Sequence, residues 1–409
     1  MGMLARIAWR NIWRNPRRSW VLISALAVGV FCFLGGIAYM DGFTLQMIDS
    51  AIEQQGGHIQ ITGRGFHENP TIRTYVADAA PIASYLADVE GIRYAPQVKA
   101  PSMISSAEQA SGTVIVGIDP RRELTVSNIP DQIVEGSYLS ESGAENEVII
   151  GVGLAEQLNV LVGERVVLMA NDLKNEISSG AYRIVGLYRT SNSNFDKANV
   201  FLHSDVARSL IGYGSNQVSA FTVNLDPERN LETTAADLHT AIGSPDLEIL
   251  TWKERSPLLL LMTEMMGIGN VILVIVLFTA IGFSIANSFL MVIFERIREI
   301  GIMMADGVRP GQIRRMLYLE AFFTLLMGTV AGGVAAFALI TWWNSVGLDL
   351  SAYAEGLNSF GAASVLYPYV DWEHVTSGFI MIYVMVLLSV VYPAFKAGRF
   401  EIAEAMHHV

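Results

Sequence analysis

The residues with the clearest chemistry are charged side chains that directly follow an apolar run, residues 285–294. The segment and its small residues are Glu295, Arg296, Arg298, Glu299, Gly301 and Gly307. A membrane helix commonly ends in basic residues, and acidic residues gain nothing from an anionic lipid surface. The mixed charges therefore favour a protein partner at this segment. An ordinary cytosolic loop with helix-supporting charge pairs is the alternative.

Polar and small residues also occur inside the apolar runs. Asn270, Asn287 and Glu320 are costly in a bilayer unless they face protein or water. They indicate either a substrate or proton path or, as we favour, packing between helices. Gly328 and Gly332 are four residues apart and form a small face that allows close contact between helices.

The sequence lacks the motifs of several catalytic sites. None of its lysines stands in a phosphate-binding G-x-x-x-x-G-K-[ST] loop, and no H-E-x-x-H or G-x-S-x-G motif occurs. We therefore predict no catalytic residue, no metal site and no cofactor on this chain. The single cysteine, Cys32, excludes an intrachain disulfide.

Composition predicts an α-helical membrane protein with four transmembrane helices and a large α/β extracytoplasmic domain between the first and second spans. The 409 residues are 52% hydrophobic, and the mean hydropathy is +0.38. About 20 helical residues cross a bilayer. The predicted segments are a cytosolic amphipathic helix (1–19), the first span (20–40), the α/β domain (41–257), a stalk with the second span (258–294), the coupling segment (295–315), the third span (316–343), a short periplasmic loop (344–375), the fourth span (376–395) and a cytosolic tail (396–409).

The distribution of positive charge predicts the orientation. Residues 1–19 and residues 295–315 each contain five arginines, whereas residues 344–375 contain no lysine or arginine. Loops rich in lysine and arginine stay in the cytosol. We expect a multi-pass membrane protein with both termini cytosolic and the α/β domain outside. A cleaved signal peptide is the alternative at the N-terminus, but no A-x-A-like site follows the first apolar run.

The α/β domain is acidic, with 15 Lys/Arg against 28 Asp/Glu in residues 41–257. Nucleic acid is therefore not expected as a partner, because phosphate binding needs a basic surface. Alternating apolar residues predict strands at 58–62, 113–118, 147–150, 165–169, 182–188, 199–203 and 219–225, with helices at 82–89, 153–158, 204–211 and 231–242. Residues 41–55 and 252–267 predict two stalk helices, the second continuing unbroken into the second span.

Several stretches resemble one family of transporters. Residues 295–307 and the N-terminal A-W-R-N-I-W-R-N-P-R-R-S resemble permeases of the MacB/FtsX type. The sequences G-H-I-Q-I (57–61) and E-V-I-I-G-V-G-L-A-E-Q-L-N-V-L-V-G-E-R-V (147–166) are similar to lipoprotein-releasing (Lol-type) permeases. The C-terminal Y-P-A-F-K-A-G-R-F-E-I-A-E-A (392–405) resembles the closing segment of the family.

This resemblance implies a non-catalytic permease subunit of an ABC transporter in the bacterial inner membrane, assembled as a dimer with a second copy or a related chain. A separate ATPase would bind ATP and Mg²⁺ and dock at the coupling segment. The Lol-type branch implies a lipoprotein or another amphiphile as cargo, passed to a periplasmic carrier. Two alternatives are a signalling or scaffold permease that activates a periplasmic enzyme and an efflux permease for small amphiphiles or peptides. A membrane-anchored enzyme is disfavoured by the missing motifs.

Overall fold

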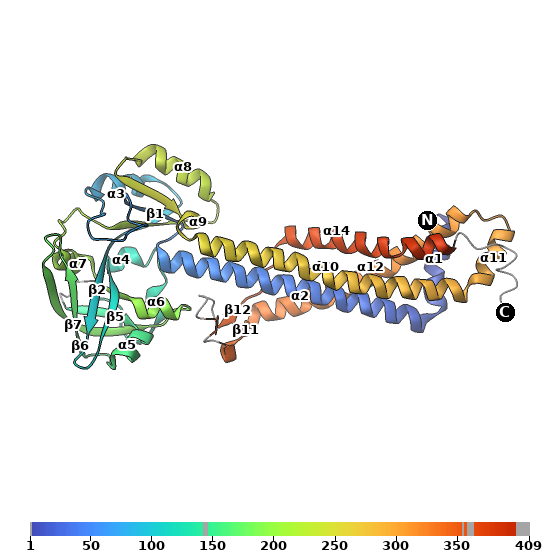
Figure 1. The fold of residues 1–409 in the computed structure, drawn as a ribbon, viewed down its shortest axis with the longest axis horizontal. Helices are drawn as coiled ribbons and strands as arrows, with labels where there is room; N and C mark the ends of the chain where they lie inside the picture. The colour runs from blue at the N-terminus through green and yellow to red at the C-terminus, as the bar shows by residue number, and fades with distance from the viewer. Residues whose placement is uncertain (1, 142–145, 354–355, 358–363, 398–409) are drawn as a thin grey trace. The chain divides into compact units, whose positions relative to one another are not determined.

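The structure is a computed structural model that describes residues 2–141, 146–353, 356–357 and 364–397 (Figure 1). Two compact units are present: a helical unit (Met1–Leu45, Thr263–Asp349, Val365–Val409) and an α/β unit (Gln46–Met262, Leu350–Ser364). Most of the predicted cytosolic tail, residues 398–409, and part of the predicted periplasmic loop, residues 354–355 and 358–363, lie outside the described residues.

Among the described residues, four helical segments are long and apolar enough to cross a membrane, as the sequence predicts. They are α2 (Pro16–Gln55), α10 (Pro257–Glu295), α12 (Pro310–Val346) and α14 (Trp372–Ser389), which is followed by α15 (Val391–Ala397). Each apolar run forms a helix because the helix satisfies its own backbone hydrogen bonds where water is absent.

Several predicted helix ends need correction. The first predicted span, 20–40, lies within a longer helix: α2 begins at Pro16, and the predicted stalk helix at 41–55 is confirmed as its continuation to Gln55. The third begins at Pro310 rather than 316, where proline occupies the first helical turn. The fourth, predicted for 376–395, breaks after Ser389, because Pro393 has no N–H to donate to the Ser389 carbonyl.

The predicted unbroken stalk at 252–267 is also wrong. A short helix, α9 (Trp252–Arg255), ends at Ser256, whose φ of −124° and ψ of 66° are not helical. Pro257 then begins α10. Proline disfavours a helical conformation of the preceding residue, which explains the break.

Small residues allow the long helices of the helical unit to approach closely. A Cβ atom on Gly332 of α12 would lie 3.0 Å from the Cα atom of Ala27 on α2. Gly378 of α14 lies against the Phe33 ring of α2, which also packs edge-on to Phe278 of α10 at 5.7 Å between centroids. The apolar core of this unit is therefore built around α2, which contacts the other three long helices.

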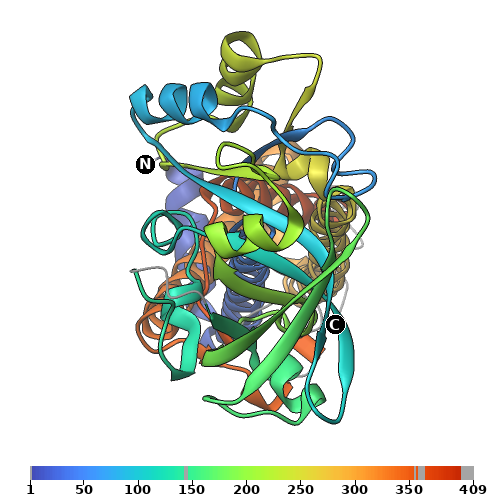
Figure 2. The same cartoon turned by 90° about the vertical axis from the view of Figure 1, so that its left-hand side faces the viewer.

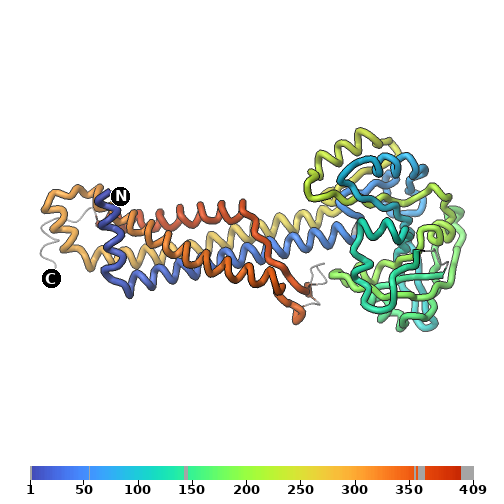
Figure 3. Tube along the Cα trace, turned by 180° about the vertical axis from the view of Figure 1, so that it is seen from behind, coloured from blue at the N-terminus to red at the C-terminus, as the bar shows by residue number. Residues whose placement is uncertain are grey.

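Shorter elements complete the helical unit. Helices α1 (Met3–Arg14) and α11 (Ile297–Ala305) lie at the same end of the bundle (Figure 3). Helix α1 rests on α12, where Trp9 packs edge-on to Phe323 with 5.5 Å between ring centroids. Strands β11 (Leu348–Asp349) and β12 (Val365–Leu366) pair after α12. A 3₁₀ turn, η2 (Ser351–Tyr353), belongs to the α/β unit.

The α/β unit contains a ten-stranded sheet (Figure 2). The strands are β1 (Ile59–Gly63), β2 (Ile92–Ser105), β3 (Ala110–Ile118), β4 (Ile133–Gly136), β5 (Glu147–Gly151), β6 (Arg165–Asn171), β7 (Ile177–Tyr188), β8 (Asn199–His203), β9 (Ala220–Leu225) and β10 (Leu247–Thr251). Their order is β10-β1-β9-β2-β3-β8-β5-β7-β4, and β6 pairs with both β2 and β7. Strand β6 therefore closes β2, β3, β8, β5 and β7 into a ring and covers their edges.

Helices cover the sheet. They are α3 (Ala79–Asp88), α4 (Pro120–Glu123), η1 (Ile129–Gln132), α5 (Val152–Leu158), α6 (Ser193–Ala198), α7 (Ser204–Ile211) and α8 (Leu231–Ile242). One apolar core lies within the strand ring and includes Ile115, Val148 and Ile184. A second core joins α3 and α8 to strands β1 and β9.

The sequence analysis missed strands β2, β4 and β10. Proline is rare in central strands, and β2 contains two prolines, Pro96 and Pro101. They interrupt the alternation of apolar residues from which a strand is predicted. Its residues 92–97 pair with β9, and residues 98–105 pair with β3. One long strand therefore contributes residues to both of the apolar cores described above.

Arg255 links the segment by which the chain enters this domain to the segment by which it leaves. Its guanidinium donates hydrogen bonds to the carbonyls of Gly56 and Gly57, at 3.2 Å and 2.9 Å. Both glycines have positive φ angles, which turn their carbonyls toward the arginine after α2 ends. The end of α2 and the residue just before the α9–α10 break are thus held side by side.

Candidate functional site

The predicted coupling segment forms a short helix between two membrane-crossing helices. Helix α11 follows α10 after Arg296, whose φ of −111° and ψ of 13° interrupt the helix. Gly307 has a φ of 88° and ends the segment, because glycine adopts this left-handed conformation without strain. Gly301 is buried, together with Ile297 and Ile300, on the inner face of α11.

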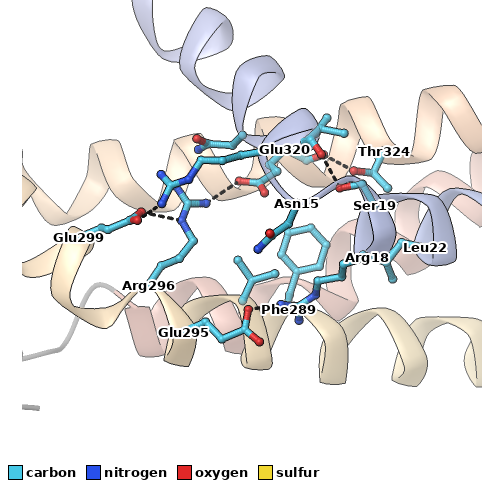
Figure 4. A pocket seen from close by; sticks show the side chains of 14 residues that line it. Asn15, Arg18, Ser19, Leu22, Phe289, Glu295, Arg296, Glu299, Glu320 and Thr324 are labelled. Carbon is cyan, nitrogen blue, oxygen red and sulfur yellow. Dashed lines mark hydrogen bonds and ion pairs between the residues drawn. The ribbon is translucent and has the colours of Figure 1, made fainter. Parts of the chain in front are cut away.

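Two of the predicted glutamates pair with arginines near the N-terminus (Figure 4). Arg18 of α2 contacts Glu295 at 2.8 Å and also donates to the carbonyl of Ser288. Arg14, the last residue of α1, pairs with Glu299. The side chain of Arg18 is 21% exposed and that of Arg14 is 59% exposed. Burial makes the Arg18 contacts the stronger ones, because exposed ion pairs contribute at most about 1 kcal/mol.

Arg296 joins the coupling segment to α12. Its Nε atom donates to Glu299 at 3.0 Å, and its Nη1 atom lies 3.7 Å from Glu320 Oε2. Both Arg296 and Glu320 are largely buried, at 16% and 10% side-chain exposure. Burying one of these charges without the other would cost several kcal/mol. Glu320, predicted as a packing residue, therefore lies opposite a specific cation.

A polar cavity of about 140 Å³ lies among these charges. Arg14, Arg18, Arg296, Glu295, Glu299 and Glu320 line it, together with polar residues of α1 and of the start of α2, including Asn11 and Ser19. A cavity of this size and polarity can hold several water molecules. The three arginines and three glutamates balance in charge, so the site suits neither an anion nor a cation as a permanent ligand.

Arg298 differs from the other charged residues of the segment. It is exposed, and the structure gives it no ion pair with any described residue. Ile302, Ala305 and Asp306 are exposed at helical spacing from it, and Ile302 is 49% exposed. Helix α11 therefore has one face within the chain and one outward face on which a partner can dock.

The other polar and glycine residues that the sequence places inside membrane helices have different surroundings. Gly328 and Gly332 of α12 face α2, where a Cβ atom on Gly328 would lie 2.5 Å from the Leu26 Cβ. Asn287 is exposed on α10, so packing within this chain does not explain it. Asn270 lines an apolar cavity of about 260 Å³ among α2, α10 and α14. The predicted packing of Asn287 against another helix is therefore not seen within this chain, and packing against a helix of a second chain stays a prediction.

The sequence analysis missed the partners of the coupling residues. Arg14 and Arg18 were assigned only to the membrane-facing N-terminus. Their spacing of four residues matches the spacing of Glu295 and Glu299, which is a signal present in the sequence. In the described part of the chain, no group of three or more His, Cys, Asp or Glu residues is arranged to hold a metal ion.

Comparison with known proteins gives matches along most of the chain. The model of the MacB-like periplasmic core domain matches residues 19–241, and that of the FtsX-like permease C-terminal domain matches residues 270–402. The lipoprotein-releasing system transmembrane protein LolC of Neisseria meningitidis serogroup B is 23% identical over 402 residues, which cover 95% of this chain and 93% of that protein.

Two other similarities are more partial. The pyoverdine export ATP-binding/permease protein PvdT of Pseudomonas syringae pv. tomato is 24% identical over 351 residues, covering 81% of this chain and 51% of that protein. The crystal structure of the periplasmic region of MacB from Actinobacillus actinomycetemcomitans is 14% identical, with a TM-score of 0.35, and covers 48% of this chain and 90% of that chain.

The fold and these matches define a multi-pass protein of the inner membrane with a MacB-like α/β domain. The chain belongs to the MacB/FtsX family of ABC-transporter permeases. This confirms the family predicted from the sequence, including its similarity to the lipoprotein-releasing permeases.

Proposed function

We propose that this chain is the non-catalytic membrane subunit that converts the motion of a separate ABC ATPase into a movement of its periplasmic domain. The cargo in this proposal is a lipid-anchored protein, extracted from the inner membrane and passed to a periplasmic carrier. The subunit acts as a dimer with a second copy or a related chain, with both termini in the cytosol.

The length of the similarity to LolC supports this choice of cargo. It covers 95% of the chain and therefore includes the α/β domain as well as the membrane helices. The partial similarity to PvdT favours export of a small amphiphile as the second candidate. Acyl chains stabilise membrane anchoring by about 0.8 kcal/mol per buried methylene, so the release of a multiply acylated protein needs an energy source.

Reconstitution distinguishes these cargoes. The chain, its ATPase and a triacylated protein are placed in liposomes, and release of the protein is measured with ATP and a periplasmic carrier. We expect ATP-dependent release and none without ATP. Movement of a soluble peptide or small amphiphile, or activation of a periplasmic hydrolase, with no release of the acylated protein would contradict the proposed cargo.

The outward face of α11 supports the docking of the ATPase. Arg298 is exposed and has no ion pair with any described residue, whereas Glu295, Arg296 and Glu299 are engaged within the chain. Reversing a charge at a protein interface costs about 2 kcal/mol or more when the pair is covered. Arg298→Glu should therefore reduce recovery of the ATPase by at least about tenfold.

The control for this variant is Arg10→Glu, the same charge change at an exposed arginine of α1. Both variants are purified from membranes, and the co-purified ATPase is quantified. Equal recovery with Arg298→Glu and wild type would refute docking through this face.

A further inference from the structure

Two helix elbows face each other at one end of the helical unit (Figure 4). Asn15 separates α1 from α2, with Arg14 and Arg18 on either side of it. Arg296 separates α10 from α11, with Glu295 and Glu299 on either side of it. The first elbow therefore presents two arginines four residues apart, and the second presents two glutamates at the same spacing, with Arg296 and Arg298 between them.

The charges pair across the two elbows in order. Arg18 meets Glu295 at 2.8 Å, and Arg14 meets Glu299. We call these four residues the elbow clasp. Two pairs in register fix both the separation and the rotation of the elbows, which a single ion pair cannot do.

Each elbow is also anchored to its surroundings. The Ser19 hydroxyl donates to the carbonyl of Ile12 at 2.5 Å and braces the α1–α2 turn. Arg296 pairs with the buried Glu320 of α12, so the second elbow is held to a membrane helix. Because both turns are braced, a displacement of one elbow moves the other through the clasp.

We propose that the elbow clasp makes α1 a second part of the coupling site. When α11 is displaced, the two ion pairs of the clasp transmit the displacement to α2. The four residues act as positioning residues. This inference rests on the proposed function, in which an ATPase displaces α11. The non-helical Arg296 lets α11 bend relative to α10. A displacement of this elbow then reaches the N-terminal elbow at two points: Glu299 of α11 contacts Arg14, and Glu295, the last residue of α10, contacts Arg18 of α2.

Charge exchange tests the clasp. The single variants Arg18→Glu and Glu295→Arg each place two like charges together, whereas the double variant restores an opposite pair in the reverse order. At the outer pair only Arg14→Glu is made, which places two carboxylates together. Glu299 is left unchanged because it also accepts a hydrogen bond from Arg296 at 3.0 Å. Arg17→Glu is the matched control, since Arg17 is exposed at the same elbow and the structure records no ion pair for it with any described residue.

The measurement separates assembly from transmission. Each variant is made in a Cys32→Ser background with Leu45→Cys near the far end of α2, where Leu45 is 37% exposed. The intact complex with its ATPase is purified, and labelling of the new thiol by a maleimide is timed with and without ATP and vanadate. The recovered ATPase is quantified in the same samples.

We expect the single clasp variants to retain the ATPase and to lose the nucleotide effect on labelling by about fivefold, which corresponds to a coupling free energy near 1 kcal/mol. The double variant Arg18→Glu with Glu295→Arg should regain most of the effect, and Arg17→Glu should match wild type. A structural defect alone would lower ATPase recovery and would not be rescued by exchanging charges.

Two results would overturn the inference. If the single variants keep the full nucleotide effect, the clasp does not transmit motion, while the proposed function stands. If wild type retains no ATPase or shows no nucleotide effect, the proposed function itself fails and the clasp loses its role with it.

Discussion

Glu123 carries a charge in the interior of the α/β domain. It is 2% exposed, and both carboxylate oxygens accept from the Gln97 amide, at 2.9 Å and 3.1 Å. Burial raises the pKa of Glu123 to about 7, against the opposing effects of Gln97 and Lys99. Burial likewise lowers the pKa of Lys99 to about 8. The domain therefore holds two charges that burial disfavours.

The raised pKa predicts how stability depends on pH. Between pH 4.5 and about 7 the folded chain binds more protons at Glu123 than the unfolded chain, so stability falls as pH rises through this window. Glu123→Gln removes this pH-dependent loss of stability, because the amide does not ionise. We expect the variant to be more stable than wild type at pH 8, by up to about 3 kcal/mol, with little difference near pH 4.5.

Thermal unfolding of the full chain in detergent at several pH values measures this effect. Glu156→Gln, at an exposed position of α5, is the control and should change stability little at any pH. Destabilisation of Glu123→Gln at pH 8 would mean that attraction to Lys99 outweighs the cost of burying the carboxylate.

At the scale of elements, close contact between α2 and α12 depends on glycine. A Cβ atom on Gly332 would meet the backbone of Ala27, whereas one on the neighbouring Gly333 would have no atom within 4 Å. Alanine otherwise stabilises a helix interior by about 1 kcal/mol relative to glycine. The two positions therefore respond in opposite directions to the same substitution.

We predict that Gly332→Ala destabilises the helical unit by about 1–3 kcal/mol, because the two helices must separate. Gly333→Ala should be neutral or stabilising by up to about 1 kcal/mol. The measurement is the free energy of unfolding of each variant. Each is purified in a mild detergent and unfolded by adding increasing amounts of a denaturing detergent. Equal effects at both glycines would show that α2 and α12 tolerate a wider spacing.

At the scale of the whole molecule, the family of this chain implies a separate ATPase as its partner. Its sequence contains no phosphate-binding loop, and it belongs to a family of ABC-transporter permeases. We predict that the purified chain alone binds no ATP at micromolar concentrations and gains ATPase activity when its separate subunit is added. Calorimetric titration with ATP measures binding by the chain alone, and phosphate release measures the ATPase activity of the assembled complex. Micromolar binding by the chain alone would disprove the prediction.

The sequence by itself determined the helices that can cross a membrane and much of the α/β domain. Long apolar runs have one stable form in a bilayer, so their number and approximate ends follow from local composition. Gly307 marked the end of the coupling segment for a reason that is also local: it has a positive φ angle, which glycine adopts without strain. The proline effects at Ser256 and Ser389 were present in the sequence too, but the predicted helix ends overlooked them.

Only the tertiary structure decided which charges meet. Arg14 and Arg18 lie more than 270 residues from Glu299 and Glu295 in the chain, and they pair because α1, α2 and α10 pack at one end of the bundle. The same packing turns Arg298 outward and leaves Asn287 exposed. Residue type fixes what a side chain can bind, but the neighbours it finds depend on long-range contacts that local sequence does not encode.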